Sequence, residues 1–347
     1  MKFMTPVTGF YCGVDLHART MYLCVIDRQG KILMHRKIGT DPEYFLRLIQ
    51  PWGKDITVAV ESTFNWYWLA DICASEDIPF ALAHALYLKA IHGSKVKNDR
   101  IDCEKIARIA LGGNLPLAYA YPRQHRAVRD LMRRRIHFVR ERAELMGHIQ
   151  CLNMQENNLP LGASLKVKAG RAAAPDNFIQ EDVRFTAEAN LAMIAHYDSV
   201  IPIMEKRILE RASNGHQREL AILDTFPGIG EVTALTIIYE MDTVDRFKSR
   251  QDFCSYARLV KPLHESGGHK SPGHGAKIGN PHLKWAFSEA AVHAAQHNES
   301  IRTLYEKLVR RHSKGRAKSI LAHKIGRAVF HMLKNGTAFD EKKFLSN

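Results

Sequence analysis

Four acidic residues in the first third of the chain have the type and spacing of a metal-binding site. Asp99 and Asp102 stand three residues apart at the start of an apolar-periodic run, so a helix there projects both carboxylates from one face. Asp15 and Glu61 each end a predicted strand. Carboxylates that converge on two Mg²⁺ ions, roughly 3.5–4 Å apart, can cleave a phosphodiester. The alternative is that Asp99 caps the helix and Asp102 only complements its dipole.

The elements that must position these acids are strands and helices in alternation. The pattern predicts strands at 10–15, 21–26, 31–38, 56–60 and 79–83, and helices at 42–50, at 65–74 and from 99 onward. Three meandering strands followed by alternating helices and strands are typical of the ribonuclease H-like fold. Sugar kinases and actin-like ATPases begin similarly, but the residues after Asp15 lack the glycine-rich phosphate loop of those enzymes.

Charge and composition favour a polyanionic partner. The 347 residues suffice for two or three domains, and 50 Lys and Arg against 36 Asp and Glu give a net charge of +14. No apolar run has transmembrane length and no signal peptide opens the chain, so we expect a cytoplasmic protein with no membrane partner. The six cysteines form no C-x-x-C pair, which favours reduced thiols over a disulfide framework or a zinc site.

An arginine-rich segment follows residue 122 and predicts a nucleic-acid surface. Through residue 142 only two acids accompany its arginines, which are Arg123, Arg126, Arg129, Arg133, Arg134, Arg135, Arg140 and Arg142. The apolar positions keep helical spacing, so a long amphipathic helix with a phosphate-binding face is predicted, and a solvated basic face is the alternative. A loop insert at 158–180 and a second long helix at 180–211 would complete an antiparallel coiled-coil arm.

The last third contains two further candidate contacts. The turn from 227 to 230 leads into a helix, so Gly228 and Gly230 either let backbone N–H groups approach a phosphate or form a plain interhelical turn. A glycine-rich polar loop at 264–275 follows, and its three histidines (264, 269 and 274) lack the spacing of a helical zinc site. Ser266, Ser271 and Tyr256 are all candidate nucleophiles. Helices are expected from after residue 282 to 297, from after residue 298 to 312 and from 314 to 334, with basic residues opposite their apolar faces.

Taken together, these motifs resemble the DEDD transposases of the insertion sequence 110 family, which are bridge-RNA-guided recombinases. The matching residues are Gly13-Val-Asp15, Val60-Glu61-Ser-Thr, Lys97-Asn-Asp99-Arg-Ile-Asp102, Pro227-Gly-Ile-Gly230 and Glu265-Ser266-Gly267. The resemblance implies that Asp15, Glu61, Asp99 and Asp102 bind Mg²⁺ and that Ser266 is the nucleophile. It also implies a guide RNA, donor and target DNA, a homo-oligomer (dimer or tetramer) and a place at the bacterial nucleoid. Phe64 and Cys103 depart from the family, which often has Gly and Ala there.

The sequence therefore predicts a three-part chain. Residues 1–115 would form an α/β ribonuclease H-like, RuvC-like domain, residues 116–215 a coiled-coil arm with a loop insert, and residues 216–347 a mainly α domain that carries the serine. The predicted function is a transposase that cuts and rejoins DNA through the serine, with the help of the Mg²⁺-binding acids. The alternatives are a metal-only RuvC-like nuclease of the Holliday-junction resolvase type and a non-catalytic nucleic-acid-binding protein.

Overall fold

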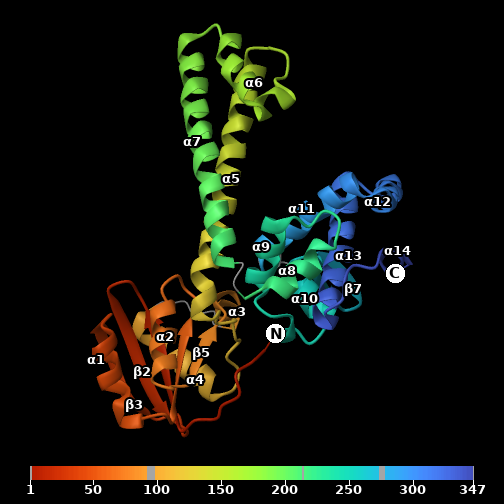
Figure 1. The fold of residues 1–347 in the computed structure, drawn as a ribbon. Helices are drawn as coiled ribbons and strands as arrows, with labels where there is room; N and C mark the ends of the chain where they lie inside the picture. The colour runs from red at the N-terminus through yellow and green to blue at the C-terminus, as the bar shows by residue number, and fades with distance from the viewer. Residues whose placement is uncertain (1, 92–97, 213–214, 273–277, 347) are drawn as a thin grey trace. The chain divides into compact units, whose positions relative to one another are not determined.

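The protein, described here by a computed structural model of residues 2–91, 98–212, 215–272 and 278–346, divides into two compact units. The first unit comprises residues 1–123 and the second residues 124–347. The first contains a mixed sheet with helices, and the second is mainly helical (Figure 1). None of the described helices combines the length and the apolar character needed to cross a membrane. The predicted division into three domains stays a prediction.

The first unit is built on a five-stranded sheet in the order β3-β2-β1-β4-β5. Its elements are β1 (Phe10–Leu16), β2 (Thr20–Asp27), β3 (Ile32–Gly39), α1 (Pro42–Ile49), β4 (Ile56–Glu61), α2 (Tyr67–Ser75), β5 (Phe80–Ala83), α3 (Ala85–Ile91) and α4 (Asp99–Leu111). The first three strands pair antiparallel, whereas β1, β4 and β5 run parallel. This topology confirms the predicted order of elements and is consistent with a ribonuclease H-like fold.

The two faces of the sheet pack against different helices because strand side chains alternate. Val14 of β1 and Val60 of β4 pack in one core with residues of α1 and α2. Tyr11 and Ala59 face the other way and pack with the buried residues of α4. Side chains at the odd positions of β1 and β4 therefore point to the side of the sheet that α4 covers.

Gly13 sets how closely α4 approaches the sheet. A Cβ at this position would lie 2.0 Å from the backbone oxygen of Cys103 and 2.5 Å from the backbone nitrogen of Ala107. Only glycine permits this contact, because both obstructing atoms belong to the helix backbone and cannot rotate away. The helix that carries Asp99 and Asp102 is thus seated directly on the strand that carries Asp15.

The second unit begins with two long helices. The elements of this unit are α5 (Arg123–Gln155), α6 (Lys168–Ala173), α7 (Glu181–Ala212), α8 (Gln217–Asp224), α9 (Glu231–Met241), α10 (Arg250–Tyr256), β6 (Leu263–Ser266), β7 (His269–Pro272), α11 (Pro281–His297), α12 (Glu299–Arg311), α13 (Lys314–Asn335) and α14 (Glu341–Ser346). Short 3₁₀ turns lie at Gln50–Trp52, Gly162–Lys166, Ala174–Asn177 and Val244–Arg246. The insert at 158–180 therefore contains α6 and two of these turns, where a loop was predicted.

Helices α5 and α7 lie antiparallel, side by side, in Figure 1. Arg142 of α5 pairs with Asp198 of α7 at 2.7 Å, and His148, further along α5, contacts Asn190, which lies earlier in α7. The pairing of later α5 residues with earlier α7 residues requires opposite chain directions. The predicted helices and their antiparallel arrangement are confirmed, whereas coiled-coil packing stays a prediction.

A buried carboxylate joins α5 to the C-terminal helices. Glu240 of α9 is 2% exposed and accepts from Arg129 Nε at 3.0 Å, from Arg133 Nη2 at 2.9 Å and from Asn280 Nδ2 at 2.7 Å. Asn280 also caps α11, since its Oδ1 accepts from the backbone N–H groups of His282 and Leu283. Around this network, apolar residues of α9, α10, α11 and α13 form one core.

Candidate metal centre and nucleic-acid interface

Three of the four predicted acids reach the same side of the sheet by strand parity and helix position. Asp15 follows Gly13 by two residues on β1, and Glu61 follows Ala59 by two on β4, so both point to the face covered by α4. Val14 lies opposite Val60 in the parallel register, which makes the two acids neighbours at the carboxyl ends of adjacent strands. Asp99 is the first residue of α4 and contacts His17 beside Asp15.

Asp102 lies one helical turn beyond Asp99 on α4. Its carboxylate is 26% exposed and lies 3.4 Å from Lys105 Nζ. Asn98, and not Asp99, is the N-cap of this helix, because its side chain accepts from the Arg100 N–H at 3.0 Å. The interpretation of Asp99 as a mere helix cap is therefore wrong, and its carboxylate is available for another role.

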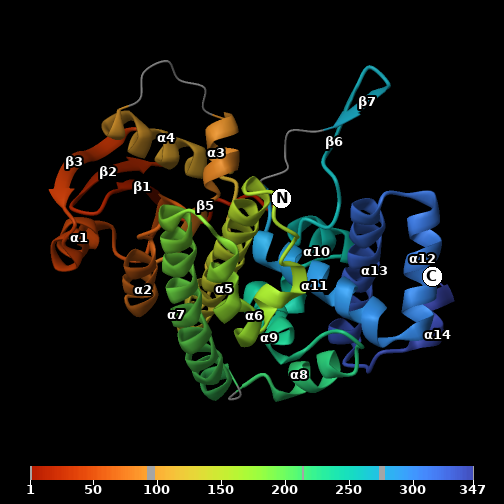
Figure 2. The same ribbon diagram turned by 90° about the horizontal axis from the view of Figure 1, so that it is seen from above.

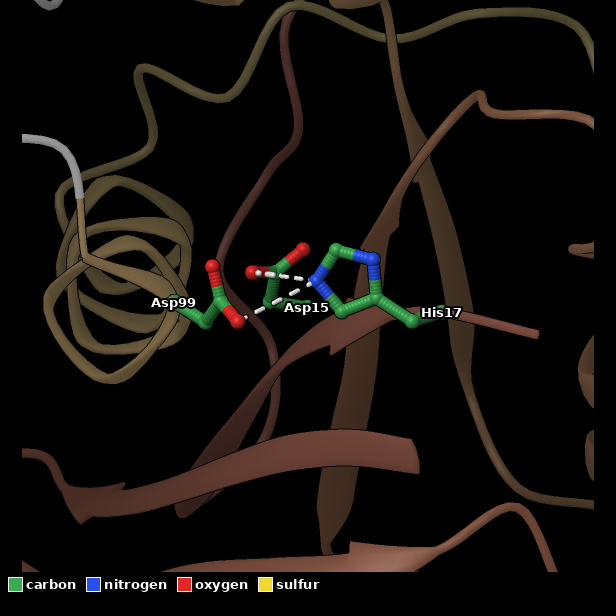
Figure 3. Close-up of side chains that lie close together, drawn as sticks. All are labelled: Asp15, His17 and Asp99. Atoms are coloured by element: carbon green, nitrogen blue, oxygen red, sulfur yellow. Dashed lines mark ion pairs between the residues drawn. The ribbon is translucent and has the colours of Figure 1, made fainter. Parts of the chain in front are cut away.

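Asp15, His17 and Asp99 form a cluster of possible metal ligands (Figure 3). His17 Nε2 lies 3.4 Å from Asp15 Oδ2 and 3.5 Å from Asp99 Oδ2. One ligand atom from each residue lies within 4.8 Å of the other two. Among the described residues no other group of three His, Cys, Asp or Glu side chains meets this criterion.

The electrostatics of Asp15 favour a cation beside its carboxylate. Burial raises the pKa of the Asp15 carboxyl, the nearby His17 lowers it, and the charges of Asp99 and Asp102 raise it again, with a net increase. A divalent cation among these carboxylates would relieve their mutual repulsion.

The predicted arginine surface is only partly available to a ligand. Arg126 and Arg129 are each 7% exposed, so the prediction that they contact phosphates conflicts with their burial. Arg133 is half-buried and pairs with Glu240, and Arg135 pairs with Glu205 of α7. These pairs hold α5 against its neighbours within the protein.

Three arginines of the predicted surface are exposed. Arg134 projects from α5, and Arg123 is 83% exposed with Asp71 at 3.7 Å. Arg140 is exposed as well. The predicted phosphate-binding role is compatible with the exposure of these three arginines. Which arginines are buried could not be predicted from composition, because the acidic partners of Arg129, Arg133 and Arg135 lie far along the chain.

The glycine turn before α9 makes a close contact inside the protein. Gly228 has φ of +96°, and a Cβ there would lie 2.3 Å from the backbone nitrogen of Ala294 in α11. The Gly228 backbone thus approaches a helix of the same unit, which favours the interhelical-turn interpretation at this position. Gly230 is exposed at the N-terminus of α9, and no described atom lies within 4 Å of the place a Cβ would take. A phosphate contact at Gly230 stays a prediction.

Ser266 lies on a hairpin that the sequence did not predict. Where a loop was expected, β6 and β7 pair antiparallel, with Ser266 opposite His269 across the Gly267–Gly268 turn. Figure 2 shows this hairpin extending away from the helices of its unit. Ser271 lies on β7, and of the three histidines considered for zinc, His274 falls outside the described residues. Tyr256 is half-buried, with the Arg246 guanidinium 4.6 Å from its ring centroid.

Comparison with known proteins then decides the family. Residues 12–153 match the DEDD_Tnp_IS110 transposase model, and residues 220–306 match the model of the transposase IS116/IS110/IS902 family. The chain belongs to the IS110 family of DEDD transposases. A transposase for insertion sequence element IS1111A, from Coxiella burnetii (strain RSA 493 / Nine Mile phase I), is 22% identical over 337 residues, which cover 92% of this chain and 88% of that protein.

Membership confirms the predicted enzyme class. The chain is a transposase of an insertion sequence and acts on DNA. The alternative of a non-catalytic nucleic-acid-binding protein is therefore wrong. A DEDD transposase domain implies a divalent metal ion, and the carboxylate-rich donor set around Asp15 fits such an ion. His17 is the member of this cluster that the sequence pattern did not predict, although its position two residues after Asp15 was a visible signal.

Proposed function

We propose that this transposase cuts and rejoins DNA with a serine nucleophile and an acidic metal site. The observation that carries the metal site is that Asp15, Glu61 and the first turn of α4 share one side of the sheet. Asp15, Glu61, Asp99 and Asp102 would hold Mg²⁺, which supplies charge stabilisation at the scissile phosphate. Their carboxylates have the oxygen donors that this hard cation prefers.

Ser266 Oγ would attack phosphorus, so that a P–O bond to serine forms while the P–O bond to one sugar oxygen of the DNA breaks; the serine proton would end on the departing sugar oxygen, which leaves as a hydroxyl. The covalent link would keep the energy of the phosphodiester bond for rejoining the DNA, whereas hydrolysis would lose that energy. Three features support Ser266 over the other hydroxyls. It falls in the Glu265-Ser266-Gly267 motif of the family resemblance, it ends β6 at the Gly267–Gly268 turn, and Tyr256 is instead packed beside Phe247 and Arg246. A serine hydroxyl is a weak nucleophile, so its attack would need the charge stabilisation that the metal site supplies at the phosphate.

A guide RNA would direct the enzyme to donor and target DNA, and the subunits would form a dimer or tetramer through the α5–α7 arm. The net charge of +14 supports binding to a second nucleic acid besides DNA, and the family resemblance indicates that this nucleic acid is a guide RNA. Such an enzyme would work at the bacterial nucleoid. RNA that copurifies with the protein and disappears on ribonuclease treatment would support this part of the proposal.

A denaturing gel with labelled element-junction DNA tests the nucleophile. We expect a covalent protein–DNA adduct with wild type, Ser271→Ala and Tyr256→Phe, and none with Ser266→Ala. Binding of DNA by Ser266→Ala should be unchanged, because the substitution removes one oxygen. An adduct that persists in Ser266→Ala and disappears in another variant would assign the nucleophile to the residue changed in that variant. Efficient cleavage by Ser266→Ala, with no adduct from any variant, would identify a metal-only nuclease.

A further inference from the structure

His17 has a fixed backbone beside the acidic site. Its N–H donates to the carbonyl oxygen of Thr20 at 3.0 Å, and its own carbonyl accepts from Thr40 Oγ1 at 3.2 Å. These two bonds tie the residue to the turn between β1 and β2 and to the end of β3. The imidazole itself is half-exposed, so packing does not dictate its direction.

The imidazole points its Nε2 between two carboxylates that come from different elements (Figure 3). The nitrogen lies 3.4 Å from an Asp15 oxygen and 3.5 Å from an Asp99 oxygen. These separations exceed the roughly 2.7–2.9 Å of a charge-assisted hydrogen bond. Two ligands about 2.1 Å from a common metal lie roughly 3.0 Å apart at a right angle and about 3.4 Å apart at a tetrahedral angle. The His17 nitrogen is therefore spaced from each of the two carboxylate oxygens about as two ligands of one cation are, and one ligand atom from each of the three residues lies within 4.8 Å of the others.

The chemistry of the donors distinguishes between cations. Carboxylate oxygens suit Mg²⁺, Ca²⁺ and Mn²⁺ alike, whereas an imidazole nitrogen favours transition metals over Mg²⁺. A site that contains His17 with Asp15 and Asp99 is thus less selective for Mg²⁺ than a site of carboxylates alone.

We propose that His17 is a nitrogen ligand of the divalent-metal site formed with Asp15 and Asp99, and that it shifts the preference of this site away from Mg²⁺ and toward transition metals, for which Mn²⁺ serves as the probe. The inference rests on the proposed metal-dependent function and refines its choice of ion. The role is specific to His17 among the nearby histidines. His35 also reaches α4, but its Nε2 lies 2.8 Å from the carbonyl oxygen of Arg100 and 3.4 Å from Cys103 Sγ.

Electron spin-echo envelope modulation of the full-length protein loaded with Mn²⁺ tests this directly, because only a ligated nitrogen gives strong ¹⁴N coupling. We expect the coupling in wild type and in the control His35→Gln, and its loss in His17→Ala. Calorimetric titration should show that His17→Ala weakens Mn²⁺ binding by at least about tenfold, the lower end of what even outer-shell changes cost. Mg²⁺ binding should change less.

Each result decides something different. Mn²⁺ bound to wild type without ¹⁴N coupling would overturn the assignment of His17, and so would coupling that survives in His17→Ala. An unchanged ratio of Mn²⁺ to Mg²⁺ affinity would overturn the proposed preference. If wild type binds neither cation, and Asp15→Asn behaves identically, the proposed metal-dependent function itself fails. The wild-type spectrum remains informative even if His17→Ala folds poorly.

Discussion

The carboxylate of Glu240 should be among the most sensitive single positions of the second unit. Glu240→Gln keeps the size of the side chain but removes a negative charge from beside the Arg129 guanidinium, whose side chain is 9% exposed. Removing one partner of a buried ion pair costs about 3–5 kcal/mol, because the other charge stays desolvated. Arg133 contributes less to this cost, since its side chain is 34% exposed and regains water. We therefore expect the free energy of unfolding to fall by about 3 kcal/mol, the lower end of that range.

The measurement should resolve the two units, because a two-domain chain need not unfold in one step. Hydrogen exchange read by mass spectrometry assigns the loss to peptides of α9 and the start of α5. Glu231→Gln is the matched control, since this residue is an exposed acid in the first turn of the same helix, and it should cost less than about 1 kcal/mol. The double variant Arg129→Gln, Glu240→Gln should recover part of the loss, since it removes both buried charges of this pair. A loss in Glu240→Gln no larger than in the control would refute the reasoning.

Three further outcomes are expected. Burial would raise the pKa of Glu240, but the hydrogen bond from Arg133 and the charge of Arg129 lower it below 4.5 overall, so its stabilisation is full above about pH 4.5 and is lost as pH falls through the folded-state pKa. Unfolding measured between about pH 7 and pH 3 should show this loss in wild type and not in Glu240→Gln. Gly13→Ala should displace α4 and lower the free energy of unfolding, measured with denaturant, by about 1–3 kcal/mol. It should also weaken metal binding, and equal Mn²⁺ affinity in wild type and Gly13→Ala would contradict this. Changing Arg123 and Arg134 to Gln should make the negative slope of log K for nucleic-acid binding against log salt less steep, by roughly 0.7–0.9 for each phosphate that is no longer bound. Arg47→Gln on α1 should leave this slope unchanged.

The sequence was most informative where local patterns determine structure. The apolar runs that predicted the strands placed Asp15 and Glu61 at strand ends, and the observed alternation of side chains along β1 and β4 then puts both acids on one face. The helix starting near Asp99 was predictable from its apolar spacing. The family resemblance, and not any local pattern, singled out Ser266 among the hydroxyls.

Long-range pairing could not be predicted in the same way. Arg129 and Glu240 are 111 positions apart, so composition alone could not separate buried arginines from exposed ones. The hairpin of β6 and β7 was predicted as a loop because its residues are polar and its strands are only four residues long. The sequence shows that His17 stands two residues after Asp15, but not that it lies beside Asp99, because Asp99 belongs to a helix that begins more than about 80 residues later.

The seat of α4 on Gly13 also bears on how this enzyme can diverge. The closest contacts of Gly13 are with the backbone of the helix, so the approach of α4 to the strand that carries Asp15 depends strongly on this one position. Neighbouring apolar residues can drift one at a time, provided that this single position stays without a Cβ. The helix–strand spacing set at this position can therefore persist while much of the surrounding sequence changes.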